Sequence, residues 1–251
     1  MGFIIELLFR LVFEVPLLRT VALTIVPALL LLWYVRSKDR LEPEPPKLIW
    51  SLVGLGMLSI LPALALELGG TYLLTQVADT DTMLFDVLNW FVVVGLSEEF
   101  CKYFMLRLRT RKEKEFNCLY DGLVYAVAVS AGFALAENIT YVLHYGPSVA
   151  FIRAVVSIPA HICFSVFMGA WYGAARKYEL KGDSAMTRRS RLMCVLIPAL
   201  THGLFDLIAD STDVGGGLII FGVYVIALFI IAWRLMKKMA ERDEFLPSHG
   251  I

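Results

Sequence analysis

Long apolar stretches separated by short polar ones follow one another along almost the whole chain. A helix that crosses a bilayer needs about 20 mostly apolar residues, and stretches of about that length recur seven times. They cover residues 17–35, 48–74, 84–106, 119–143, 149–175, 192–209 and 218–236. This pattern predicts an all-α, polytopic transmembrane helix bundle with about seven spans.

The composition supports this prediction, because 58% of the 251 residues are hydrophobic and only 18% are charged. A soluble domain carries more charge than this. The longest polar stretch, residues 176–191, is too short for a separate soluble domain, so we expect one integral membrane domain over residues 1–251. The solvent for such a surface is lipid. We therefore expect a multi-pass protein of the cell membrane that does not bind nucleic acid.

Lys and Arg are distributed very unevenly over the predicted loops. Most of the 23 such residues follow spans one, three and five or lie in the C-terminal tail, whereas the opposite loops hold only Arg10, Arg19 and Arg153. Lys and Arg accumulate on the cytoplasmic side of membrane proteins. The bias predicts that the N-terminus lies outside and the C-terminus in the cytoplasm.

Residues 1–15 have a pattern of their own. Glu6, Arg10 and Glu14 recur every four residues among Phe, Ile and Leu, and Pro16 ends the run. This spacing places the charges on one helical face, which is typical of a helix lying in the membrane interface. We expect an interfacial helix here, and a longer, tilted first span is the alternative.

Several ionisable side chains lie inside the apolar spans, and nearly all belong to four consecutive ones. Each such group at mid-membrane costs roughly 2.5 to 3.5 kcal/mol on insertion scales, so these groups are rare unless they face a cavity and each other. Spans three to six, within residues 84–210, are therefore expected to share one polar interior. Its candidate residues are Glu98, Glu99, Lys102, Glu137, His161, His202 and Asp206.

Spacing within two spans places complementary groups side by side. Lys102 follows Glu98 by four residues and Glu99 by three, so it can pair with either carboxylate. His202 and Asp206 are also four residues apart, so the acid can orient the imidazole and set its tautomer. Counting depth at about 1.5 Å per residue predicts a cavity in the middle to outer half of the bilayer, opening away from the cytoplasm.

The balance of charge in this interior suggests a chemistry. Four acids opposed by one Lys cannot all be ionised in a medium of low dielectric constant, so we expect one or more of them to hold a proton at neutral pH. A buried carboxyl group can take a proton from water, and a neighbouring imidazole can stabilise a developing oxyanion. The chemistry that this arrangement supports is hydrolysis of an amide.

The segment EEFCK at residues 98–102 resembles the first motif of the PrsW family of intramembrane proteases, which is related to the type II CAAX prenyl endopeptidases in the glutamic intramembrane protease superfamily. Three more segments are similar to motifs of this family and follow in the same order: FALAEN at 133–138, PAH at 159–161 and HGLFD at 202–206. The loop 39–45 is similar to the cytoplasmic signature of the family. The resemblance covers residues 33 to 210, most of the chain.

This resemblance implies an endopeptidase that hydrolyses peptide bonds of membrane proteins without a cofactor or bound metal. Family members are associated with cleavage of an anti-sigma factor on its extracytoplasmic side, as the first step of a signalling cascade. In the mechanism that it implies, Glu98 or Glu99 activates water, with Glu98 preferred, and Lys102 neutralises the neighbouring acid. The remaining roles are oxyanion binding by His161 and His202, orientation of His202 by Asp206, and completion of the polar wall by Glu137.

Four other interpretations of the same residues stay open. A zinc metalloprotease would use His161, His202 and a Glu as ligands, although the chain has no HExxH segment. A transporter or proton channel would also be lined by acids and His, and a membrane chaperone could have kept the fold without catalysis. The fourth is a buried hydrogen-bond network that only fixes helix packing. The sequence specifies neither the substrate nor the oligomeric state.

Overall fold

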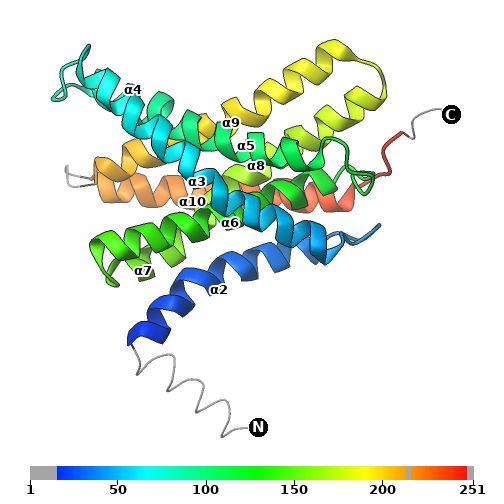
Figure 1. The fold of residues 1–251 in the computed structure, drawn as a ribbon, viewed down its shortest axis with the longest axis horizontal. Helices are drawn as coiled ribbons and strands as arrows, with labels where there is room; N and C mark the ends of the chain where they lie inside the picture. Colours follow the sequence, from blue (N-terminus) through cyan, green and yellow to red (C-terminus); the bar gives the residue numbers. More distant parts are fainter. Residues whose placement is uncertain (1–15, 213–215, 248–251) are drawn as a thin grey trace, which may run out of the picture.

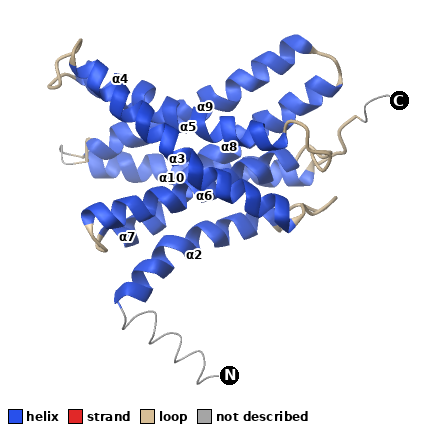
Figure 2. Cartoon of the chain, in the orientation of Figure 1, coloured by secondary structure: helices blue, strands red, loops and turns tan. Residues whose placement is uncertain are grey.

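The computed structural model describes residues 16–212 and 216–247, and this part of the chain is helical nearly throughout (Figures 1 and 2). An isolated bridge between Cys118 and Phe245 is the one β-type pairing among these residues. The expected all-α class is confirmed, whereas the proposed interfacial helix of residues 1–15 lies outside the described residues. The helices are α2 (Pro16–Arg36), α3 (Pro46–Thr75), α4 (Met83–Leu88), η1 (Asn89–Gly95), α5 (Leu96–Thr110), α6 (Asp121–Tyr145), α7 (Val149–Ile152), η2 (Arg153–Ser157), α8 (Ile158–Leu180), α9 (Ser184–Asp210) and α10 (Gly217–Glu241).

Six helical stretches of the described chain are long and apolar enough to cross a membrane. Five of them are α2, α3, α6, α9 and α10, and the sixth runs through α7, η2 and α8 as Val149–Leu180. The third predicted span consists of α4, η1 and α5, which follow one another without a break but are more polar because they carry Glu98, Glu99 and Lys102. The multi-pass helical architecture is confirmed.

The connection between α8 and α9 differs from the sequence-based expectation. The sixth span was expected over 192–209, but α9 already begins at Ser184, inside the polar stretch 176–191. Gly182 has φ +74°, a conformation that favours Gly, and reverses the chain directly after α8. Asp183 then caps α9, because its Oδ1 accepts a hydrogen bond from the backbone N–H of Met186 at 3.0 Å. The polar stretch is therefore two helix ends joined by a tight turn.

Helix α6 lies in the middle of the bundle and packs against α2, α3 and α8 (Figure 1). Residues 121–135 of this helix are all buried. Small residues permit these close approaches, as is common between membrane helices. A Cβ atom on Gly132 would lie 2.0 Å from the carbonyl oxygen of Val53 in α3, and one on Gly169 of α8 would lie 2.4 Å from the Cα of Leu123. The backbones of α3 and α8 thus touch that of α6.

The loops gather at two ends of the bundle (Figure 1). Loops 37–45, 111–120 and 181–183 lie at one end together with the C-terminal segment, and loops 76–82 and 146–148 lie at the other. The first end, here named the basic end, carries the segments rich in Lys and Arg. Its assignment to the cytoplasm, and the expected position of the N-terminus outside, stay predictions from the charge bias.

Candidate active site

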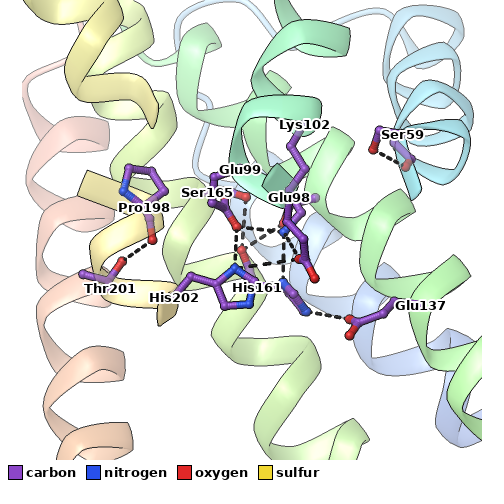
Figure 3. Close-up of polar contacts among 12 residues, drawn as sticks. Ser59, Glu98, Glu99, Lys102, Glu137, His161, Ser165, Pro198, Thr201 and His202 are labelled. Carbon is purple, nitrogen blue, oxygen red and sulfur yellow. Dashed lines mark hydrogen bonds and ion pairs between the residues drawn. The ribbon is translucent and has the colours of Figure 1, made fainter. Parts of the chain in front are cut away.

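The seven residues singled out in the sequence come from four helices and meet in one cluster. All of them except Asp206 are labelled in Figure 3. We name these seven residues the Glu–His cluster. The expected convergence of spans three to six is therefore present in the structure, whereas the catalytic roles of the residues stay predictions. The members are Glu98, Glu99 and Lys102 from α5, Glu137 from α6, His161 from α8, and His202 and Asp206 from α9.

Lys102 lies at the centre of the cluster and is almost fully buried. Its Nζ is 3.0 Å from Oε2 of Glu98, 2.8 Å from Oε1 of Glu99 and 3.1 Å from Nδ1 of His161. An ammonium group has three N–H donors, so all three are used. The same Nζ lies 4.0 Å from the ring centroid of Phe133, a cation–π contact. Lys102 pairs with both carboxylates at once, where the spacing left the choice open.

The contacts of His161 define its tautomer. Nδ1 accepts a hydrogen bond from the Lys102 ammonium, so the proton of a neutral ring lies on Nε2. Nε2 then donates to Oε2 of Glu137 at 2.7 Å, and that carboxylate also pairs with Nη2 of Arg153 at 2.8 Å. Glu137 thus orients His161, a more specific contact than the completion of a polar wall.

His202 lies between two carboxylates. Its Nδ1 is 3.0 Å from Oε1 of Glu99, and its Nε2 is 3.2 Å from Oδ2 of Asp206. Both ring nitrogens can donate at once only in the imidazolium form, so the geometry favours a positively charged ring. The expected contact between His202 and Asp206 is present. Each His of the cluster therefore directs Nε2 toward a carboxylate outside the first motif, Glu137 for His161 and Asp206 for His202.

Phe164 holds the two imidazole rings in place. Its ring stacks on His202 with a centroid distance of 4.7 Å, and it meets His161 edge-on at 5.9 Å. The two imidazoles themselves are 5.1 Å apart and nearly perpendicular. Aromatic contacts of this kind stabilise a ring orientation. Sequence reasoning missed Phe164, because one Phe in an apolar span gives no signal.

Two π-helical segments lead into helices that carry site residues. η1 runs directly into α5, which carries Glu98, and η2 runs directly into α8, which carries His161. Such segments are rare and occur frequently at functional sites. Around η1 the backbone touches α9, since a Cβ on Gly203 would lie 2.7 Å from the Cα of Phe91 and one on Gly95 would lie 2.8 Å from the carbonyl oxygen of Ala199. This contact brings the start of α5 close to α9, and hence the two Glu close to His202.

A cavity of about 360 Å³ opens beside the cluster and is lined by Glu98, His161 and His202. Its lining includes Glu67 of α3, Tyr141 of α6 and Ala209 of α9, which lie toward the helix ends that face away from the basic end. That direction agrees with the depth estimate from the sequence. A water molecule takes up about 30 Å³ in the liquid, so the cavity has room for water together with a short segment of peptide.

The two Glu of the first motif differ in their access to this cavity. Glu98 lines it, and the contacts of Glu98 with Lys102 and His202 both use Oε2. Glu99 is fully buried behind it, and its Oε1 is held by both Lys102 and His202. A general base must reach its water. Glu98 is the carboxylate placed to do so.

Arg153 was assigned to an outer loop by sequence reasoning, but it belongs to the site. Its Nη2 pairs with Glu137, its Nε donates to Oδ1 of Asn138 at 3.1 Å, and its guanidinium stacks over the ring of Tyr141 at 3.7 Å. Glu67 also lines the cavity. Charges near span ends are ordinary, so neither residue could be recognised before the helices were assembled.

The fold and the site together define a multi-pass helical membrane protein with a buried carboxylate–histidine centre that opens to a cavity. Residues 44–234 match the family described as "PrsW family intramembrane metalloprotease". The chain belongs to this PrsW family of intramembrane proteases, as the motifs in its sequence indicated. It is accordingly a protease that acts in the lipid bilayer on membrane proteins.

Several curated relatives resemble the chain over most of its length. The protein named Protease PrsW of Clostridioides difficile is 35% identical over 226 residues, covering 88% of this chain and 92% of the relative. Protease PrsW of Oceanobacillus iheyensis is 31% identical over 217 residues, with 86% and 94% covered, and that of Geobacillus kaustophilus is 31% identical over 230 residues, with 90% and 93% covered. No solved structure matches the chain.

The description of the family names a metalloprotease, and four side chains of the Glu–His cluster are of types that bind zinc. One ligand atom from each lies within 4.8 Å of the others. The second ring nitrogen of each His faces a carboxylate, as is usual for zinc ligands. The space among these atoms, however, holds the Lys102 ammonium, which lies within 3.1 Å of three of them. Zinc needs ligands at about 2.0–2.2 Å, so the residues as arranged do not fit a metal unless Lys102 moves away. The four side chains are Glu98, Glu99, His161 and His202.

Proposed function

We propose that this chain is an endopeptidase of the glutamic type, in which Glu98 activates water for the hydrolysis of a peptide bond in a membrane protein. The observation that carries the proposal is the position of Glu98 at the cavity wall, with Lys102 behind it and two carboxylate-oriented His rings beside it. The Lys102 ammonium lies 3.0 Å from Oε2 of Glu98, so a negative charge on this carboxylate has a partner at the cavity wall.

The reaction follows from this arrangement. Glu98 takes a proton from water, and the oxygen of the water attacks the carbonyl carbon of the substrate, so that the carbonyl oxygen becomes an oxyanion. The protonated Glu98 then gives its proton to the amide nitrogen as the C–N bond breaks. The products are a carboxylic acid and an amine. Lys102 offsets the charge of the carboxylate pair throughout.

The oxyanion is bound by the two His rings through an exchange of partners. Both Nε2–H groups already donate to a carboxylate that lines the cavity, Glu137 for His161 and Asp206 for His202. A substrate oxygen between the rings replaces these carboxylates as acceptor. Glu137 keeps its ion pair with Arg153 when His161 turns away, and the side chain of Asp206 is partly exposed at the cavity, so neither carboxylate is left fully buried without a partner.

We propose an anti-sigma factor as the substrate, cleaved at the first step of a signalling cascade, because the resemblance to the family implies this. The direction of the cavity supports cleavage on the extracytoplasmic side, since it extends toward the end opposite the basic end.

The test compares fragments of membrane proteins from cells that carry the wild-type chain, Glu98→Gln, or the control Glu241→Gln, which replaces an exposed acid at the end of α10. Fragments should disappear with Glu98→Gln and persist with the control. If no fragment depends on Glu98, the protein is no glutamic endopeptidase. A membrane chaperone would tolerate this substitution.

A metal-dependent protease is the second candidate, favoured by the family description and by the four donor atoms of the Glu–His cluster. His161, His202 and a Glu of the first motif would hold the metal, which would polarise the scissile carbonyl. A chelator series on the purified protein separates the two candidates. Activity that is lost on chelation and returns with zinc supports the metal, whereas activity that persists in excess chelator supports Glu98 alone.

A further inference from the structure

A second group of buried acids lies at the basic end of the bundle. Asp39 belongs to the loop after α2, Glu44 comes just before α3, and Asp121 is the first residue of α6. One carboxylate oxygen from each lies within 4.8 Å of the other two. All three side chains are more than nine-tenths buried. We name these three residues the acidic cap cluster.

The carboxylate oxygens of this cluster are mostly without protein partners. Both oxygens of Asp39, Oε2 of Glu44 and Oδ1 of Asp121 are buried and have no hydrogen-bond partner of good geometry among the described residues. The backbone of Glu42 and Glu44 makes only looser contacts with Asp39. Buried polar atoms are normally hydrogen-bonded in about nine cases of ten. Four such oxygens around one point therefore need an explanation.

Tyr125, which is not an acid, also faces the acidic cap cluster. Tyr125 lies one turn further along α6, is fully buried and interacts with Glu44 and Asp121. Its hydroxyl group has no hydrogen-bond partner of good geometry in the described chain. A fourth side chain with an unpaired polar atom thus faces the acidic cap cluster.

The charges around the cluster do not balance. Arg36 is the cation that acts on Asp39, but its Nη2 donates to the backbone carbonyl oxygen of Glu44 at 2.6 Å, not to a carboxylate. Asp243 of the C-terminal segment adds a further negative charge beside Asp39. Burial raises the pKa of Asp39 to about 6 and that of Glu44 to about 7. These carboxylates lack a cation of the kind that Lys102 supplies to the Glu–His cluster.

We propose that the acidic cap cluster binds a hard divalent cation such as Mg²⁺ or Ca²⁺. Its donors are all oxygen atoms, which these ions prefer, and among the described residues no His or Cys belongs to the group to favour zinc. Opposite ligands of Ca²⁺ lie about 4.6–5.2 Å apart, twice its usual bond length, so donor atoms within 4.8 Å suit an ion of this size with little movement.

The bound cation would hold one loop and the central helix together at the basic end. Asp39 and Glu44 belong to loop 37–45, and Asp121 begins α6. The C-terminal segment lies beside them, because the backbone N–H of Tyr120 donates to Oδ1 of Asp243 at 2.8 Å. Asp121 and Glu137 are 16 positions apart on α6, about 24 Å along the helix. The cation is therefore structural and takes no part in the cleavage.

The test uses the purified full-length protein in lipid nanodiscs, freed of cations by chelation and dialysis. Adding Mg²⁺ or Ca²⁺ should raise the temperature of unfolding of the wild type by about 5 °C. Asp39→Asn should abolish this shift, and Glu44→Gln should do the same. Asn has the size of Asp and keeps a side-chain oxygen that can face the backbone of Glu42 and Glu44, so Asp39→Asn removes the charge and changes little else. Glu241→Gln, which changes an exposed acid near the same end, should keep the full shift.

Mn²⁺ binding measured by electron paramagnetic resonance separates this site from the Glu–His cluster. Wild type and the double variant His161→Ala and His202→Ala should each bind one Mn²⁺ tightly, and Asp39→Asn should not. No bound Mn²⁺ in the wild type overturns the proposal, as does an equal thermal shift in wild type and Asp39→Asn. A wild type that gains stability only from acid, and none from cations, shows that protons occupy the cluster instead.

Discussion

The Glu–His cluster and the acidic cap cluster solve the same physical problem in two ways. Each buries several carboxylates where an isolated charge costs several kcal/mol. In the Glu–His cluster the chain supplies its own cations, with Lys102 between Glu98 and Glu99 and Arg153 on Glu137. In the acidic cap cluster the nearest cation, Arg36, bonds to a backbone oxygen instead.

The difference teaches what each cluster can be used for. A carboxylate that pairs with an ammonium group of its own chain keeps its partner at all times. A catalytic site needs charges fixed in this way in order to act without reorganisation. A cluster without its own cation must take up an ion or protons from solution. Its stability then depends on the ions and the pH of the solution. This is acceptable for a structural site that holds a loop to a helix.

The largest effect is expected from Glu98→Gln. Glu98 is the acid that lines the cavity, and loss of a general base typically costs about 10²- to 10⁴-fold in rate. Cleavage of a membrane-protein substrate by the purified enzyme should fall by that factor, with the helical circular dichroism spectrum unchanged. Glu241→Gln is the matched control. Equal losses in Glu99→Gln and Glu98→Gln would show that the two acids act as one unit.

Lys102→Ala tests whether the built-in cation is what separates the two clusters. Removing it leaves Glu98 and Glu99 buried without their partner, which should lower the free energy of unfolding by about 3–5 kcal/mol. Without Lys102, the Glu–His cluster should need an ion from solution, as the acidic cap cluster does. Zinc should therefore stabilise the variant more than the wild type. Thermal unfolding with and without zinc measures both effects. A variant as stable as the wild type without zinc would contradict the central role of Lys102.

Gly203→Ala should have a smaller effect, through the position of the site and not its charges. A Cβ at Gly203 would press against the backbone of Phe91 at 2.7 Å and push η1 away from α9. A displacement of about 1 Å can cost 10²-fold in rate, so we expect activity to fall by about 10- to 100-fold while the protein stays folded. Gly222→Ala on α10 is the control, because nothing lies within 4 Å of its added Cβ. Equal activity of the two variants would show that this contact does not position the site.

Much of this architecture could be predicted from the sequence, because lipid makes the polar residues conspicuous. Seven acids and bases in four apolar spans are costly to expose to lipid, so they are expected to face one another. Their convergence therefore followed from the energy of burial. The pairing of Lys102 with the two Glu, and of His202 with Asp206, followed from helical spacing.

The rest depends on tertiary contacts that leave no local pattern. Arg153 is an ordinary charge at a span end until α6 brings Glu137 and Asn138 to it. Asp121 is the first residue of α6, a position where an acid is ordinary. Its neighbours Asp39 and Glu44 come from a distant loop, so the acidic cap cluster could not be recognised before the chain was folded.

The smallest effect is expected from pH on the acidic cap cluster. The pKa of Asp39 is raised to about 6 and that of Glu44 to about 7, chiefly by burial. An acid with a raised pKa in the folded state stabilises the fold fully below its unfolded value, near pH 4, and this contribution is lost as the pH rises through 6 and 7. The cation-free wild type should therefore unfold at a lower temperature at about pH 8 than at about pH 5, and Mg²⁺ should reduce that difference. Asp39→Asn should also reduce it, and an unchanged pH dependence in this variant would contradict the comparison. The charged and titratable groups that face these two acids, and that must be kept unchanged in the experiment, are Arg36, Glu42, Glu115, Asp121, Tyr125 and Asp243.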